Sequence, residues 1–426
     1  MTRGAESCTE PEALARAAWS ALVEPGDPVA GALVGLYGAG PALRWARIAA
    51  AHGVEAALAE TDPISSDGAV VPVDAVDPDG ALGPDGFPGP GALGPVRRRL
   101  ARAVSRWEPR LAGLDPRRDL DRLERAGGRL LHPASAGWPT ALADLGPTAP
   151  LCLWVRGDDD LAALVRGSAA LVGSRASTAY GERVATGLAE GLAGRGVAIL
   201  SGGAYGIDAA AHRGALAVDG RTVVLLAGGV DRPYPQGNAR LIENALASGG
   251  AAVSESPPGA VPLRSRFLQR NRLIAALGSA TVVVEAAWRS GALSTAHHAA
   301  ALLRPLGAVP GPVTSVASAG CHRLLRAGAA VCVTDTAEVL ELLAPAGEHL
   351  APDPAEDTRP GDGLDPGARR VLDILPRRGA TTHEDLARRA GLSVAEARAA
   401  VGELALAGLA VRAPTGWARA APRVDV

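Results

Sequence analysis

Short loops rich in glycine and serine recur where apolar runs of this sequence end, and such loops bind anions. The stretch "ILSGGAYGIDAAAH", residues 199–212, passes from an apolar run through three glycines into a helix-like segment. "VGSRASTAYG" and "AAWRSGALSTA" repeat this arrangement after two other apolar runs. Backbone N–H groups at a helix start attract phosphate. The three loops provide the candidate phosphate ligands Gly173, Ser174, Arg175, Ser201, Gly202, Gly203, Ser290 and Gly291.

A cluster of arginines precedes the apolar run "LIAAL" in "RSRFLQRNRLIAAL". An isolated arginine pair is more often a solvated helix face, but this cluster lies near several glycine loops, which favours phosphate contacts. It adds the candidates Arg264, Arg266, Arg270, Asn271 and Arg272, with Arg240 as a further one. Phe267 is a candidate for base stacking, although a core position is the commoner outcome for phenylalanine. Glu285 is expected to pair with an arginine rather than to act in catalysis.

Several phosphate-directed loops exceed what one mononucleotide requires, whereas a nucleic-acid strand presents one phosphate per nucleotide. The charge distribution agrees with an anionic partner. Residues 1–95 hold thirteen Asp or Glu and four Arg, whereas residues 260–330 hold eight Arg and one acid. The sequence therefore favours single-stranded nucleic acid as the ligand of the basic region.

The composition argues against several other function classes. All 43 basic residues are arginine, so a P-loop lysine or a lysine Schiff base is excluded. The glycines of "SGGAYG" do not fit G-x-G-x-x-G, which argues against a NAD-type cofactor. The four cysteines are scattered and are expected to be buried apolar residues rather than metal ligands. We therefore expect no cofactor and no metal.

The chain lacks a continuous apolar run of membrane-spanning length, and its N-terminus lacks a signal-peptide pattern, so we expect a cytoplasmic protein. Seven apolar, β-rich runs alternate with helical stretches, which predicts an α/β fold: a doubly wound, Rossmann-like, three-layer domain. A Gly38–Gly40 turn between helices resembles a helix-hairpin-helix unit, with nucleic-acid contact and simple packing as equal alternatives. The tail predicts a winged helix whose third helix offers only Arg398 as a basic residue, which favours protein contacts over base reading.

The predicted order is a helical domain (1–60), a Pro- and Gly-rich linker (61–96), a Rossmann-like DNA-binding domain with a helical lead-in (97–343), a second linker (344–367) and a winged helix (368–426).

The motifs "GSRASTAYG", "SGGAYGIDAAAH", "VDRPYPQGN", "SESPPG", "RNRLIAALGSATVVVEA" and "SGALSTA" occur in this order over about 170 residues. This series closely resembles the DNA-processing protein A family, also called Smf. The resemblance implies a non-catalytic, dimeric protein that binds single-stranded DNA and helps load the RecA recombinase during natural transformation. It implies DNA contacts at Arg175, Arg270 and Arg272, beside the Ser201–Gly203 and Ser290–Gly291 loops.

The chain departs from the family pattern at two positions. Leu268 replaces the proline of F-P-x-R-N-R, and Gln236 stands where some relatives carry a basic residue, for which Arg240 is a possible substitute. Two alternative functions stay open. One is a nucleotide-hydrolysing enzyme of the phosphoribohydrolase type, with Asp208 or Glu285 in catalysis; the chain lacks the P-G-G-x-G-T-x-x-E motif of that group. The other is an interaction scaffold whose phosphate loops are unused.

Overall fold

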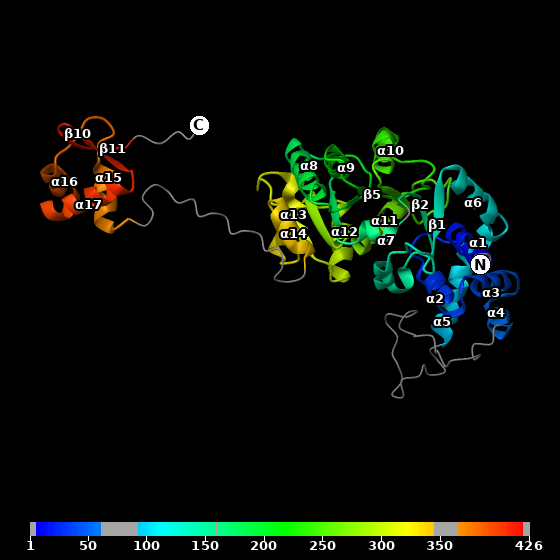
Figure 1. The fold of residues 1–426 in the computed structure, drawn as a ribbon. Helices are drawn as coiled ribbons and strands as arrows, with labels where there is room; N and C mark the ends of the chain where they lie inside the picture. Colours follow the sequence, from blue (N-terminus) through cyan, green and yellow to red (C-terminus); the bar gives the residue numbers. More distant parts are fainter. Residues whose placement is uncertain (1–5, 61–92, 159, 345–363, 421–426) are drawn as a thin grey trace. The chain divides into compact units, whose positions relative to one another are not determined.

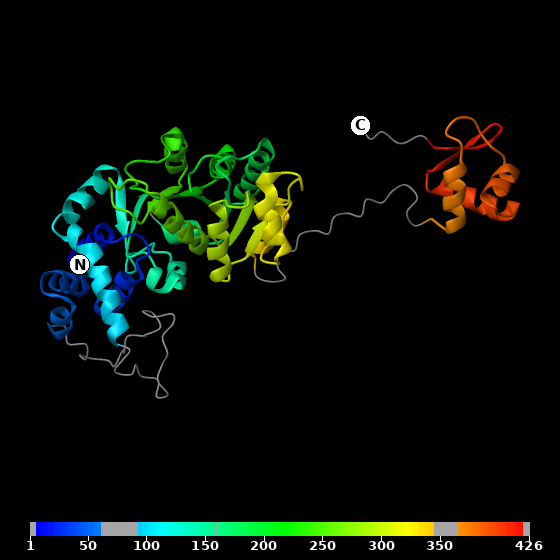
Figure 2. The same cartoon turned by 180° about the vertical axis from the view of Figure 1, so that it is seen from behind.

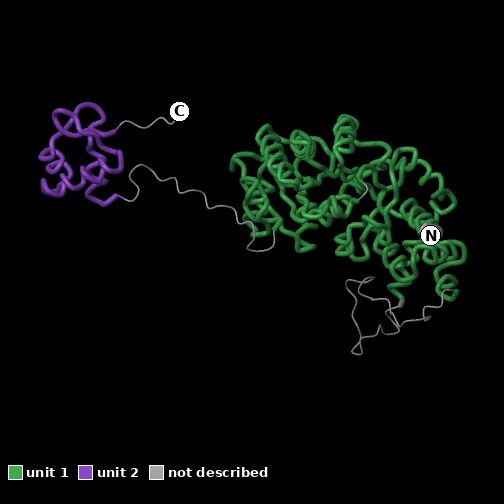
Figure 3. The backbone as a smooth tube through the Cα atoms, in the orientation of Figure 1, with its two compact units in different colours: residues 1–351 green, residues 352–426 purple. Residues whose placement is uncertain are grey.

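The computed structural model describes residues 6–60, 93–158, 160–344 and 364–420. The chain divides into two compact units, residues 1–351 and residues 352–426 (Figures 1 and 3). The first unit contains a large sheet with helices on both of its faces and a group of N-terminal helices at one end of the sheet. The second unit is small and has its own core. Most of the two predicted linkers, 61–96 and 344–367, lies outside the described residues.

The sheet has nine strands in the order β1-β2-β6-β5-β4-β3-β7-β8-β9. The seven apolar runs singled out in the sequence form its parallel strands: β3 (Ala169–Gly173), β4 (Ile199–Ser201), β5 (Thr222–Leu226), β6 (Ala251–Ser254), β7 (Ala280–Glu285), β8 (Leu306–Ala308) and β9 (Val331–Cys332). The prediction of a doubly wound α/β fold is therefore confirmed. Two antiparallel strands at one edge, β1 (Gly128–Leu131) and β2 (Leu153–Gly157), were not foreseen.

Alternating residues of β3 explain why both faces of the sheet are covered. Ala170 and Val172 pack into one core, and Ala169 and Leu171 pack into another. The first face is covered by α7 (Leu161–Val165), α11 (Arg264–Leu277), α12 (Ala292–Ala301) and α13 (Ala319–Arg326). The second is covered by α8 (Ala179–Ala193), α9 (Ile207–Ala217), α10 (Ala239–Ala247) and α14 (Thr336–Leu343). Figure 2 shows these layers from behind.

The N-terminal helices form a separate hydrophobic core beside β1 and β2. The helices are α1 (Glu6–Leu22), α2 (Pro28–Tyr37), α3 (Ala39–His52), α4 (Val54–Glu60) and α5 (Leu93–Leu111). Trp107 of α5 stacks edge-on against Trp19 of α1, with ring centroids 5.4 Å apart. Most of α5 falls in the helical lead-in predicted for the Rossmann-like domain (97–343), and its buried face belongs to the helical core. Next in the chain, α6 (Pro116–Arg125) packs against α1 and β1.

The Gly38–Gly40 turn connects α2 and α3, and the carbonyl of Ala39 accepts a buried hydrogen bond from the Trp19 indole at 3.0 Å. This hydrogen bond supports the alternative in which the turn packs against α1 and does not contact nucleic acid.

The second unit has the order expected of a winged helix: α15 (Pro366–Ile374), α16 (His383–Ala390), α17 (Val394–Leu406), β10 (Ala410–Ala413) and β11 (Gly416–Arg419). Ser393 and Glu396 form a capping box at the start of α17.

The cysteine prediction holds for Cys152 and Cys321, which are buried, but it is wrong for Cys332, which is exposed on β9. Burial raises the pKa of the Cys152 thiol to about 12 and that of the Cys321 thiol to about 11. The side chain of Cys8 lies outside the described residues. None of the described helices combines the length and the apolar character needed to cross a membrane.

Candidate functional site

A pocket of about 750 Å³ opens at the carboxyl ends of the central strands. The chain runs from β3 to β4 on one side of β3, and the strand on the other side is β7, so the strand order reverses here. Doubly wound sheets bind ligands at this topological switch point. Eight predicted residues line the pocket: Gly173, Ser174, Arg175, Arg264, Arg270, Asn271, Ser290 and Gly291.

The loop after β3 is held in place by the end of β7. The amide of Ser174 donates to the carbonyl of Glu285 at 2.7 Å, and the Glu285 carboxylate accepts from the amide and the hydroxyl of Thr178 at 2.8 and 2.7 Å. Thr178 in turn caps α8. The expectation that Glu285 pairs with an arginine is thus wrong: its partner is Thr178, and Glu285 does not line the pocket.

The start of α9 closes over the same loop. The amide of Ile207 donates to the carbonyl of Ser174 at 3.2 Å. Gly206, just before it, has a φ of +76°, and a Cβ there would lie 2.3 Å from the Ser174 carbonyl oxygen. Only glycine meets both conditions.

Arg270 lies at the bottom of the pocket. Only 6% of the residue is exposed, and its Nη1 donates to the carbonyl of Leu225 at 2.9 Å. A Cβ at Gly202 would lie 1.6 Å from this Nη1, so the absence of a side chain at Gly202 admits the guanidinium group. The Nε of Arg270 is buried and has no hydrogen-bond partner within the described part of the chain.

Among the charged neighbours of Arg270, Asp208 has the largest electrostatic effect on its pKa. Burial raises the pKa of the Asp208 carboxyl, and the positive charge of Arg270 opposes that rise. Burial likewise lowers the pKa of Arg270 to about 10, with Asp208 acting against the shift and Arg175 adding to it. The pocket therefore contains a desolvated positive charge with an unused donor, which is suited to an incoming anion.

The rim of the pocket combines arginine with aromatic rings. The guanidinium carbon of exposed Arg175 lies 4.4 Å from the centre of the Phe267 ring. Phe267 also contacts Tyr234, with ring centroids 6.0 Å apart, and Tyr234 is 48% exposed. Phe267 is thus a lining residue of the pocket rather than a core residue. Flat rings beside cationic groups match the chemistry of stacked bases and phosphates.

The six remaining predicted residues do not line the pocket; Gly202 is described above and Arg272 below. Ser201 is fully buried, and its hydroxyl donates to the carbonyl of Leu171 at 2.6 Å. The carbonyl of Gly203 accepts from the Asn238 side chain at 3.0 Å. Arg266 forms a two-pronged ion pair with Glu24 of the N-terminal helices, at 2.8 and 3.0 Å. Arg240 is exposed on α10.

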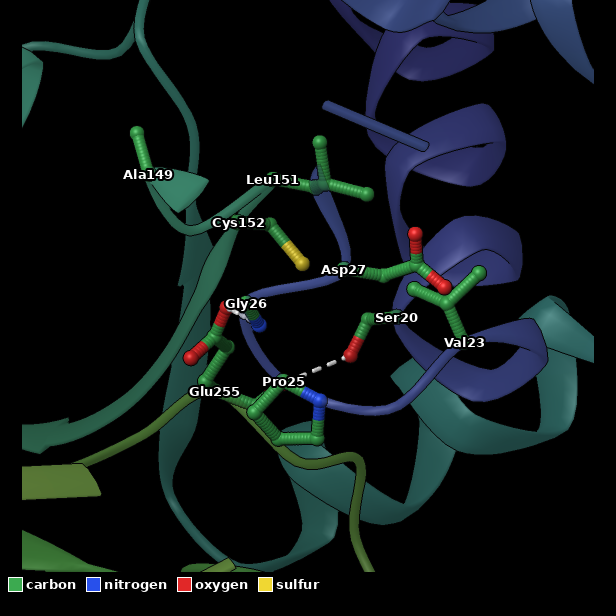
Figure 4. A pocket seen from close by; sticks show the side chains of 9 residues that line it. All are labelled: Ser20, Val23, Pro25, Gly26, Asp27, Ala149, Leu151, Cys152 and Glu255. Atoms are coloured by element: carbon green, nitrogen blue, oxygen red, sulfur yellow. Dashed lines mark hydrogen bonds between the residues drawn. The ribbon is translucent and has the colours of Figure 1, made fainter. Parts of the chain in front are cut away.

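Arg272 also lies away from the pocket, in a buried ion pair. Its Nη1 and Nη2 each approach the Glu255 carboxylate at 2.7 Å, and it donates to the Thr148 carbonyl at 3.0 and 2.8 Å. Glu255 also accepts from the amide of Gly26, and its carbonyl accepts from the Ser20 hydroxyl (Figure 4). This network joins α11 to the N-terminal helices, so the geometry gives Arg272 a structural role instead of the predicted DNA contact.

The structure adds Arg289, which was not a candidate, to the pocket. It also places there Phe267, the candidate for base stacking, and Asp208, which the enzyme alternative invoked. Arg289 stands directly before the Ser290–Gly291 loop and is exposed. Its position shortly after an apolar strand could have identified Arg289 as a pocket residue from the sequence. Asp208 reaches the pocket because the turn at Gly206 brings the first turn of α9 there.

Together, a doubly wound sheet and an arginine-lined pocket at its switch point define a Rossmann-like protein with a pocket whose charge suits anionic ligands. The model of the family described as DNA recombination-mediator protein A matches residues 129–344, and that of the DprA winged helix domain matches residues 353–416. The chain belongs to the DNA-processing protein A (DprA/Smf) family.

Comparison with individual relatives supports this family assignment. The chain is 48% identical over 305 residues to a putative DNA processing protein DprA from Mycobacterium tuberculosis, covering 68% of this chain and 77% of the relative. It is 40% identical over 272 residues to protein Smf from Escherichia coli, covering 63% and 72%. The crystal structure of DNA processing protein A from Streptococcus pneumoniae superposes with a TM-score of 0.50 at 33% identity, covering 58% of this chain and 85% of that one.

No group of three His, Cys, Asp or Glu side chains is arranged to hold a metal ion within the described residues.

Proposed function

We propose that this protein binds single-stranded DNA in the pocket at the switch point, with backbone phosphates on the arginines and bases against the aromatic rim. The observation that carries the proposal is Arg270, a buried guanidinium group whose Nε has no partner in the described part of the chain. A phosphate oxygen at this position would satisfy the donor and neutralise the charge.

The surrounding residues support a nucleic-acid strand as the source of that phosphate. Arg175, Arg264 and Arg289 line the pocket as exposed cations, so several phosphates can be neutralised side by side. The contact of Phe267 with Tyr234 supplies stacking surface next to them. A free mononucleotide would leave part of this cationic rim without a partner.

Family membership extends the proposal. The bound strand would be transferred to the RecA recombinase, the active form would be a homodimer, and the process served would be DNA recombination during natural transformation in the cytoplasm. The protein would act by binding, without a catalytic step of its own.

The test is fluorescence anisotropy of a labelled single-stranded oligonucleotide at several salt concentrations, with duplex DNA as competitor. Arg270→Gln removes the buried cation, and Arg175→Glu reverses an exposed one. We expect each to weaken binding by about tenfold or more, and the salt dependence to become shallower.

Arg195→Glu is the matched control. Arg195 is exposed and lies four residues before the start of β4, so it lies at the amino edge of the sheet, opposite the pocket. Wild-type affinity in the Arg175→Glu variant, or equal losses in that variant and in the control, would refute the proposal. In that event hydrolysis of nucleoside monophosphates becomes the next assay, because Asp208 lines the pocket and burial raises the pKa of its carboxyl.

A further inference from the structure

A second concave site is formed by α6 together with the loops that carry two of the motifs, "VDRPYPQGN" and "SESPPG". This cavity of about 340 Å³ is lined by Arg122 and Arg125 of α6, Arg232 and Asp231 of the loop after β5, Ala126 and Gly259. We name it the α6 site. Its arginines come from segments more than 100 residues apart in sequence, so the fold alone brings them together.

The lining of the α6 site has a net positive charge, with three arginines and one aspartate. Arg122, Arg125 and Arg232 are all exposed, and no carboxylate in the described ranges forms an ion pair with any of them. Asp231 is the one acid of the lining, and its Oδ1 accepts the amide hydrogen of Gly259 at 2.8 Å. Arg125 donates through Nε to the carbonyl of Asp121, which fixes its side chain while its terminal nitrogens have no hydrogen-bond partner among the described residues. Three guanidinium groups that line one cavity have the chemistry to bind phosphate.

The loop after β5 connects the α6 site to the first pocket. Arg232 lines the α6 site, and Tyr234, two residues later, contacts Phe267 of the first pocket. Tyr234 is half-exposed and therefore available for stacking between the two arginine groups. Both sites also lie at carboxyl ends of parallel strands, because the loops that carry Arg232 and Gly259 follow β5 and β6.

We propose that the α6 site is a second phosphate-binding site, which holds the backbone of the same DNA strand after it leaves the first pocket and passes Tyr234. This inference rests on the proposed function and deepens it, because it assigns a path and a minimum length to the bound strand. A strand of only a few nucleotides fills the first pocket alone, whereas a longer one engages both sites.

The experiment compares oligonucleotides of about 4 and about 20 nucleotides by fluorescence anisotropy across a salt series. The test protein is the full chain with Arg122→Glu, Arg125→Glu and Arg232→Glu together. We expect affinity for the longer strand to fall by about tenfold or more, and the slope of log affinity against log salt to become shallower by about 2, since each phosphate on a single strand contributes about 0.7. Affinity for the short strand should stay within about twofold of wild type, because salt screens most of the effect that charges at the α6 site have on the first pocket.

The matched control carries Arg166→Glu, Arg195→Glu and Arg221→Glu, which produce the same change in net charge. These three arginines are exposed and precede β3, β4 and β5, at the amino edge of the sheet. A neutral version, with glutamine at positions 122, 125 and 232, separates loss of attraction from newly created repulsion. It should show a smaller decrease in the same direction.

The outcomes distinguish this inference from the proposed function. If wild type binds both strands and the α6-site variant binds the longer one as the control does, the α6 site is overturned and the proposed function stands. If wild type binds neither strand, the proposed function itself fails. Inorganic phosphate, replacing chloride at equal ionic strength, should weaken binding of the longer strand more in wild type than in the α6-site variant, and equal weakening in both would overturn the α6 site.

Discussion

At the scale of single residues, the pocket depends on a close approach between one side chain and one backbone segment. Arg270 is placed against Gly202, where a Cβ would lie 1.6 Å from its Nη1, and its hydrogen bond to Leu225 fixes the guanidinium group. The same neighbours that bury Arg270 lower its pKa only to about 10, so it keeps its charge near neutral pH. Gly202 therefore leaves the space that the guanidinium group of Arg270 occupies, although Gly202 itself does not line the pocket.

We predict that Gly202→Ala displaces the guanidinium group of Arg270 and weakens binding of single-stranded DNA by about tenfold, equivalent to about 1.4 kcal/mol. The control is Gly187→Ala on the exposed side of α8, where an added Cβ meets nothing within 4 Å. This control should leave DNA binding unchanged and stabilise the fold by about 0.5–1 kcal/mol. Equal affinities in the two variants, measured by anisotropy, would contradict the role assigned to Gly202.

At the scale of elements, a buried histidine links α9 to β5 below the pocket. Nδ1 of His212 lies 2.7 Å from the hydroxyl of Thr222, which itself donates to the carbonyl of Ile199 at 2.7 Å. Nδ1 must therefore be the protonated nitrogen, and the buried Nε2 lacks a partner among the described residues. Burial lowers the pKa of His212 to about 3, with the positive charge of Arg270 adding to the effect.

This lowered pKa predicts a loss of stability in mild acid. Between pH values of about 6.5 and about 3 the unfolded chain binds a proton at His212 that the folded chain does not, so the free energy of unfolding falls as the pH falls. From about pH 7 to about pH 5 the loss amounts to about 2 kcal/mol. We expect His212→Asn, whose amide can still donate to Thr222, to lack this component. Urea denaturation at both pH values measures it, and identical pH dependence in wild type and variant would refute it.

At the scale of the whole molecule, the helical N-terminal core and the sheet are joined by buried polar contacts. The side chains of Arg272 and Glu255 in the central ion pair are 3% and 10% exposed. The indole of Trp154 on β2 donates to the hydroxyl of Ser20 on α1 at 2.9 Å, beside the same network. The helices that precede the sheet are therefore part of the structure that positions α11, which carries Arg270.

We predict that Arg272→Met lowers the free energy of unfolding of this unit by about 3–5 kcal/mol, because it leaves the Glu255 carboxylate buried without its partner. The double variant Glu255→Gln, Arg272→Met should recover part of that loss. Urea denaturation followed by tryptophan fluorescence reports the change, since Trp19 and Trp154 are buried at the junction. A double variant that is less stable than the single one would show that the unpaired charge is not the cause.

The sequence by itself determined the parallel part of the sheet, the winged helix and eight residues of the pocket. Continuous apolar runs separated by helical stretches are typical of strands buried on both faces, and loops after parallel strands converge on one edge whatever their side chains. The edge strands β1 and β2 could not be predicted as a hairpin, because a long segment with a 3₁₀ helix (Thr140–Thr148) separates them in place of a short turn.

Only the tertiary structure decided which arginines face the pocket. Arg264, Arg266, Arg270 and Arg272 are neighbours on one helix, yet two of them line the pocket, one pairs with Glu24 and one with Glu255. Their partners lie on segments remote in sequence, and helical spacing carries no information about those segments. For the same reason the α6 site became visible only once the chain was folded. Local pattern determines the elements, whereas the partner of a charged side chain depends on which distant residue it meets.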